Sequence, residues 1–110
     1  MTHGSTITKQ AAATITKDFR DATGSGSISF DNGSGTQLKG ELFDKGCFGD
    51  ILEQQGCEGI RIYYGLNANS KFCLVLVGVN SNGDDMEDGE IFEIGSNCPP
   101  NCGKPSDLNS

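Results

Sequence analysis

Two neighbouring segments with β-strand patterns constrain the fold of this chain more than any other feature. Residues 59–66 alternate between apolar and other side chains, and residues 67–71 are turn-forming. The apolar positions of the first segment are Ile60, Ile62, Tyr64 and Leu66. Residues 72–79 are apolar on both faces, which is typical of a strand that is covered on both sides. The sequence therefore predicts a hairpin whose second strand is central in a sheet.

Two helices are expected before this hairpin. Residues 9–22 have apolar side chains at helical spacing, with Thr8 as the N-cap and Gly24 at the stop. The expected buried face carries Ala12, Ile15 and Phe19. A second helix is expected to have Asp44 as its cap and to end at Gly56. Its apolar face carries Cys47, Phe48, Ile51 and Leu52.

The remaining strands are short, and the expected fold class is α+β. Strands are expected at residues 28–30 and 90–94, each beside turn-forming residues. Two N-terminal helices should then pack on a small antiparallel sheet of three to five strands. A chain of 110 residues with 16 Gly and no Trp has room for one thin core. We expect a single domain over residues 1–97, followed by a Cys-Pro-Pro element and flexible tail over 98–110.

Several of these segments also resemble a known group of sequences. The similarity lies in residues 59–66 (Gly-Ile-Arg-Ile-Tyr-Tyr-Gly-Leu), 74–79 (Leu-Val-Leu-Val-Gly-Val), 82–86 (Asn-Gly-Asp-Asp-Met) and 98–102 (Cys-Pro-Pro-Asn-Cys). On these motifs the chain resembles small uncharacterised bacterial proteins, chiefly from Bacteroidota, that often close with a Cys-Pro-Pro-x-Cys element. The resemblance implies a shared fold and no particular activity.

The charge of the chain limits its partners. Eight Lys and Arg against fifteen Asp and Glu give a net charge of −7, which repels phosphate backbones and anionic lipids. We therefore expect neither nucleic acid nor membrane as a partner. The first residues show no secretory signal pattern, so a cytoplasmic location is expected. The alternative is export in the folded state through a dedicated secretion or injection machine.

Most of the remaining chemistry lies with the five cysteines. The two prolines between Cys98 and Cys102 stiffen their loop, so the sulfurs would either face each other or converge on a metal. A zinc site would take Cys57 as the third ligand. In an oxidising environment, a disulfide would join Cys98 to Cys102, or Cys57 to one of them. Cys47 and Cys73 are expected to be small hydrophobic core residues.

The acidic run over residues 84–90 raises the question of calcium. If Gly83 stands at the invariant glycine of an EF-hand loop, Gly89 falls where the bidentate Glu is required. The EF-hand pattern therefore fails. A weak calcium site of another kind is the alternative to a solvated acidic turn that keeps the sheet edge from associating.

Catalytic groups are scarce, and an enzyme is not expected. The single histidine is His3, close to the start of the chain, so a nucleophile would lack a well-held base. The dense carboxylates lie in one exposed turn, where nothing would raise a pKa for general acid catalysis.

We therefore expect a small binding module that recognises a protein partner. Its contact surface would be the hairpin face with Arg61 and Tyr63, together with Asp84 and Asp85 of the neighbouring turn. One alternative is a cargo or effector protein of a bacterial contractile injection system. A second alternative is a thiol or zinc protein that uses Cys57, Cys98 and Cys102.

Overall fold

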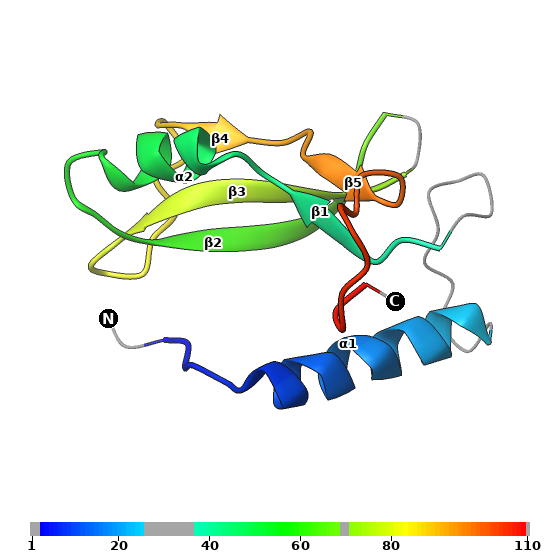
Figure 1. Cartoon of the computed structure of the whole chain (residues 1–110). Helices are drawn as coiled ribbons and strands as arrows, with labels where there is room; N and C mark the ends of the chain where they lie inside the picture. Colours follow the sequence, from blue (N-terminus) through cyan, green and yellow to red (C-terminus); the bar gives the residue numbers. More distant parts are fainter. Residues whose placement is uncertain (1–2, 26–36, 69–70, 110) are drawn as a thin grey trace. The chain divides into compact units, whose positions relative to one another are not determined.

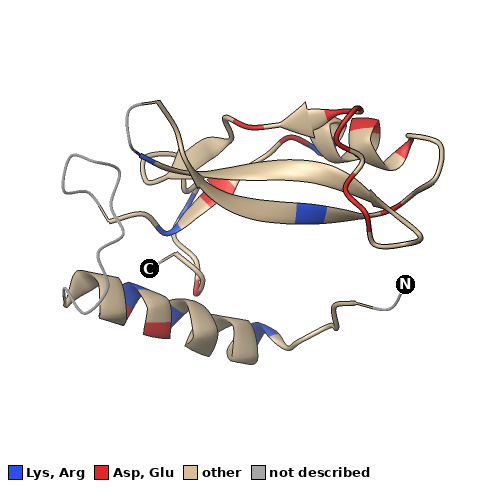
Figure 2. Ribbon diagram, turned by 180° about the vertical axis from the view of Figure 1, so that it is seen from behind, with Lys and Arg blue, Asp and Glu red and all other residues tan. Residues whose placement is uncertain are grey.

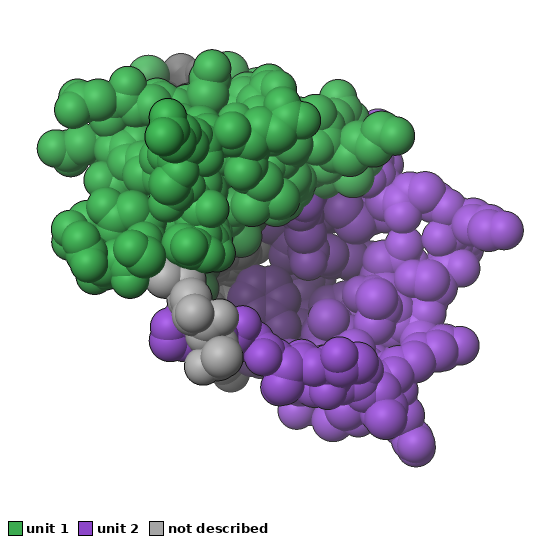
Figure 3. Space-filling view, turned by 90° about the vertical axis from the view of Figure 1, so that its left-hand side faces the viewer, with its two compact units in different colours: residues 1–2, 42–96 green, residues 3–41, 97–110 purple. Residues whose placement is uncertain are grey.

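The computed structural model describes residues 3–25, 37–68 and 71–109 (Figure 1). The chain divides into two compact units, coloured separately in Figure 3. The first unit contains Leu42–Ser96, and the second contains His3–Glu41 and Asn97–Ser110. Two helices and small antiparallel sheets are present, so the expected α+β fold class is confirmed.

The first unit is built on the predicted hairpin. Strands β2 (Cys57–Leu66) and β3 (Phe72–Asn80) pair antiparallel, and β4 (Ile91–Phe92) pairs with the other edge of β3. The strand order β2-β3-β4 makes β3 central, as predicted. The centre of β3 is buried, with Leu76 only 1% exposed. A continuous apolar run therefore forms the core of this unit, because its side chains are covered on both faces.

Helix α2 (Lys45–Leu52) packs on one face of this sheet and is drawn above β3 in Figure 1. The contact is close at Gly78: a Cβ atom there would lie 3.2 Å from Cγ2 of Ile51, which is fully buried. Asp44 occupies the N-cap position, but its side chain makes no capping hydrogen bond. The predicted end at Gly56 is wrong. The helix ends at Leu52, and Gly56 has a φ of +88° in the turn that precedes β2.

The apolar face of β2 is less covered than the alternation predicts. Cross-strand neighbours share a face, so Ile60 lies opposite Gly78, beneath α2, whereas Tyr64 and Leu66 lie further along the strand. Tyr64 is 82% exposed and Leu66 is 74% exposed. The eight residues of α2 span about 12 Å, and the ten residues of β2 span about 33 Å. The helix is therefore too short to cover the whole face.

The fourth expected strand is shorter than residues 90–94. Pairing stops after Phe92, and Ile94 has a φ of +64°. A β-branched residue rarely adopts this left-handed backbone conformation, and it does not continue a strand. The strand expected at residues 28–30 lies outside the described residues.

The second unit contains α1 (Lys9–Gly24). As predicted, Thr8 is its N-cap, and the Thr8 hydroxyl accepts a hydrogen bond from the Ala11 N–H at 3.0 Å. The helix continues two residues beyond the expected end. Its predicted buried face is wrong at Ile15, which is 61% exposed. The half-buried stripe runs instead through Ala12, Thr16, Phe19 and Thr23.

The C-terminal residues of the second unit contact other segments of the chain. Strands β1 (Gly40–Leu42) and β5 (Ser96–Cys98), whose residues Leu42 and Ser96 are counted with the first unit, pair in a two-stranded sheet. Arg20 of α1 donates a hydrogen bond to the Leu108 carbonyl at 2.7 Å, and Lys39 donates one to the Asn109 carbonyl at 2.9 Å. Side chains from two other segments therefore hold the end of the chain.

Candidate interaction surface on strand β2

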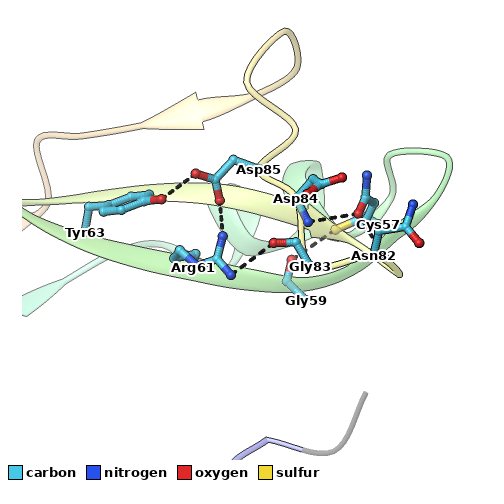
Figure 4. A network of polar contacts seen from close by, with 9 residues as sticks. Cys57, Gly59, Arg61, Tyr63, Asn82, Gly83, Asp84 and Asp85 are labelled. Carbon is cyan, nitrogen blue, oxygen red and sulfur yellow. Dashed lines mark hydrogen bonds and ion pairs between the residues drawn. The ribbon is translucent and has the colours of Figure 1, made fainter.

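The structure brings three of the four predicted surface residues together. Arg61 and Tyr63 lie on the same face of β2 and point toward Asp85 from the turn after β3 (Figure 4). Arg61 forms an ion pair with one carboxylate oxygen of Asp85, and the Tyr63 hydroxyl donates a hydrogen bond to the other oxygen. Arg61 also donates to the Gly83 carbonyl at 3.2 Å. We call Arg61, Tyr63 and Asp85 the polar cluster.

The polar cluster crosses the central strand. Arg61 is paired in register with Val77 of β3, and Asp85 forms an isolated bridge with Val79 on the far edge of that strand. Side chains of neighbouring strands that pair in register lie on the same face. The ion pair therefore spans β3 on the face opposite to α2, with Val77 and Val79 buried.

The turn that presents Asp85 is held by its own hydrogen bonds. The side-chain oxygen of Asn80 accepts from the N–H groups of Asn82 at 2.9 Å and Asp84 at 3.0 Å. The Asn80 N–H donates in turn to the Asp84 carbonyl at 3.0 Å. Gly83 takes a φ of +83°, which this tight turn requires and glycine readily adopts. Asp84, the fourth predicted residue, thus joins the turn through its backbone.

The contacts of the polar cluster shift the proton affinities of its members. The hydrogen bond from Tyr63, assisted by Arg61, lowers the pKa of Asp85 below its ordinary value. The same hydrogen bond to Asp85 raises the pKa of Tyr63, and the contact with Asp85 raises the pKa of Arg61. At neutral pH the cluster is therefore an ionised Arg–Asp pair with a neutral tyrosine, and its charges compensate each other.

The other face of β2 carries exposed apolar side chains that sequence reasoning assigned to the buried side. Ile62 is 46% exposed and precedes the more exposed Tyr64 and Leu66 at alternate positions. The Tyr64 ring stacks on the Phe72 ring with centroids 6.3 Å apart. We call Ile62, Tyr64 and Leu66 the apolar row. The exposure of the apolar row could have been predicted from the sequence. The segment between Asp44 and Gly56 is too short for a helix that would cover the whole face of β2.

The predicted cysteine sites are only partly brought together. Cys98 and Cys102 form a disulfide in the second unit, which confirms one of the predicted pairings. Cys57 belongs to the first unit, where its thiol donates a hydrogen bond to the Gly59 carbonyl at 3.2 Å. Across residues 3–25, 37–68 and 71–109, no group of three or more His, Cys, Asp or Glu side chains is arranged to hold a metal. The zinc site remains a prediction.

The acidic charge of the chain is concentrated in the first unit. Leu42–Ser96 contains ten acidic and three basic residues, so this unit carries the full net charge of −7 (Figure 2). Part of it lines a hollow of about 530 Å³ between α2 and the turn before β4, where Asp50, Glu53, Asp88 and Glu90 surround Gln54. The Gln54 side chain closes this turn by accepting from the Glu90 N–H at 2.8 Å. The weak calcium site considered for the acidic run over residues 84–90 remains a prediction.

Comparison of the chain with family models, curated proteins and solved structures finds no match. No helix among the described residues is long and apolar enough to cross a membrane. His3, the single histidine, is exposed in the segment before α1. The exposed apolar row and the polar cluster of β2 supply the basis for a proposal about function.

Proposed function

We propose that this chain is a small non-catalytic protein-binding module that contacts its partner through strand β2. The observation that carries the proposal is the apolar row, which lies exposed on an edge strand. Edge strands expose free N–H and C=O groups that pair with other chains, and proteins usually protect them with Lys, Pro or short length. β2 is ten residues long and contains neither Lys nor Pro.

The polar cluster supports the same proposal from the other face of β2. Arg61 is the one charged side chain between residues 59 and 66, and its guanidinium is engaged by Asp85 and the Gly83 carbonyl. The one charge in this part of the strand is thus compensated. A partner strand would add along such an edge through main-chain hydrogen bonds, and the alternating side chains would supply specificity.

A capture experiment tests this proposal. The parent chain and a Tyr64→Lys/Leu66→Lys double variant are immobilised, and proteins retained from a lysate of the native organism are compared. Both positions are exposed, so the double variant should still fold, with a urea midpoint lowered only by the loss of the Tyr64–Phe72 stacking and of any partner bound at that concentration, while the partner is no longer retained. Ile15→Lys, at a similarly exposed apolar residue of α1, is the matched control and should retain the partner. Equal capture by the parent and the double variant would refute the proposal.

The disulfide favours one second candidate, a thiol protein. Cys98 and Cys102 are bridged, which is the oxidised form of a dithiol pair. A zinc form would instead use the reduced pair with Cys57. Intact mass measured with and without reductant, on protein purified without chelator, separates these states. A metal mass lost on denaturation would support zinc, a mass gain on reduction would support the dithiol pair, and five free thiols without metal would contradict both.

A further inference from the structure

We infer that the occupant of the outer edge of β2 is β2 of a second copy of this chain. Two three-stranded sheets would then join into one continuous antiparallel sheet about a twofold axis. The inference rests on the proposed function, because it names the partner of the same strand. Within the described residues, β3 is the one strand that pairs with β2, so its other edge has no strand partner.

The apolar row is complementary to itself in an antiparallel pair. Residues opposite each other across such a pair lie on the same face of the sheet. A register centred on Tyr63 places Ile62 opposite Tyr64 of the second copy, and Ile60 opposite Leu66. Aromatic and β-branched side chains are favourable cross-strand pairs. Each exposed side chain of the apolar row would therefore be covered by an apolar side chain.

The same register also suits the face of the polar cluster. Arg61 would lie opposite Gly65 of the second copy, and the absence of a side chain there leaves room for the guanidinium and its bond to Asp85. Tyr63 would meet Tyr63 of the second copy at the twofold axis. The contacts inside each copy can therefore persist in the dimer.

The distribution of charge favours β2 of a second copy over a basic peptide as the occupant of this edge. The edge between residues 59 and 66 carries only Arg61, which is already paired with Asp85. The carboxylates of Asp50, Glu53, Asp88 and Glu90 lie around α2 and the turn before β4, and β4 pairs with the edge of β3 that β2 does not occupy. Glu58 stands near the start of β2, and the antiparallel arrangement would keep the two copies of Glu58 about 30 Å apart along the strands. An uncharged apolar strand is the chemistry that this edge fits.

Sedimentation equilibrium and native mass spectrometry test the inference on the full chain. The parent should reach twice its mass of 11.6 kDa as its concentration rises through the micromolar range. Tyr64→Lys/Leu66→Lys should weaken the dimer at least tenfold, because lysine on an edge strand opposes pairing. Ile15→Lys should dimerise like the parent. Added salt should leave the dimer unchanged or strengthen it, since each copy carries a charge of −7.

Cysteine cross-linking tests the register. Tyr63→Cys places two thiols opposite each other at the twofold axis, within the distance that a disulfide spans. Leu66→Cys is the matched control, because its two copies would stand about 20 Å apart along the strands. A covalent dimer should form with Tyr63→Cys alone. The parent chain, which has the native thiols Cys47, Cys57 and Cys73, measures the background.

The outcomes separate the inference from the proposed function. A parent chain that stays monomeric at every concentration would overturn the inference. Suppose that the parent is monomeric but retains a host protein that the double variant does not retain. The proposed function then stands, with that host protein as the partner of β2. A dimer that survives Tyr64→Lys/Leu66→Lys would refute the β2 interface. If capture is also unchanged, the proposed function fails with it.

Discussion

The close packing of α2 on β3 predicts that Gly78 tolerates no side chain. A Cβ atom at Gly78 would lie 2.9 Å from Nε2 of Gln54, 3.2 Å from Sγ of Cys57 and 3.2 Å from Cγ2 of Ile51. The glutamine can swing away, but Ile51 is fully buried and must move with its helix. Overpacking of this kind costs about 1–3 kcal/mol, and replacing a strand glycine returns about 0.5–1 kcal/mol.

Gly78→Ala should therefore lower the free energy of unfolding by about 1 kcal/mol, and Gly78→Val should lower it further. The matched control is Gly49→Ala in α2, where a Cβ atom would meet nothing within 4 Å. That variant should gain up to about 1 kcal/mol from helix propensity. Urea titration followed by circular dichroism gives both values. A Gly78→Ala midpoint at or above that of the parent would refute the packing of α2 on this face.

Three further predictions follow from the other contacts. The contacts with Tyr63 and Arg61 hold the pKa of Asp85 in the folded chain below its ordinary value of 3.8, so protonation of this carboxylate favours the unfolded chain. The free energy of unfolding should thus fall as pH drops below about 4, and Asp85→Asn should flatten that fall in acid titrations followed by fluorescence of Tyr63 and Tyr64. Ile94→Asn should raise the melting temperature, because Ile94 is 84% exposed and asparagine adopts its positive φ more readily; an unchanged or lower value would contradict the strained backbone. Cys98→Ser/Cys102→Ser should lose about 2 kcal/mol of stability to urea, and equal midpoints would show that the bridge does not stabilise the chain.

The parts of the fold that sequence alone predicts are those with a local cause. The alternation in residues 59–66 and the apolar run in 72–79 are sufficient for the hairpin and for the central position of β3, because each pattern reports burial directly. The Thr8 cap is equally local, since its hydroxyl bonds a backbone N–H only three residues away.

The parts that were missed depend on how far one element extends over another. The exposure of Tyr64 and Leu66 follows from the length of α2, and the alternation of β2 does not contain that information. The contact between Arg61 and Asp85 joins residues 24 apart in the chain. Sequence reasoning placed both on one surface, but their mutual neutralisation depends on the register of β2 and β3 and on the turn after β3.

The cysteines show the same limit in a different form. The Cys-Pro-Pro-Asn-Cys spacing left a local bridge, a bridge to Cys57 and a zinc site open, because each needs only that the sulfurs converge. Of these three alternatives, the structure has the bridge between Cys98 and Cys102, which are four residues apart in the chain. The assignment of Cys57 to the first unit follows from the long-range pairing of β2 with β3, which the spacing of cysteines does not encode.

Amide hydrogen exchange of residues 59–66 tests the central claim most directly, because the claim is that the outer edge of β2 is open in the isolated chain and closed on binding. At low concentration, alternate amides of β2 should exchange rapidly while the amides bonded to β3 stay protected. Raising the concentration, or adding a captured partner, should protect the rapid set in the parent but not in Tyr64→Lys/Leu66→Lys. Uniform protection at low concentration, or no change on binding, would contradict the account.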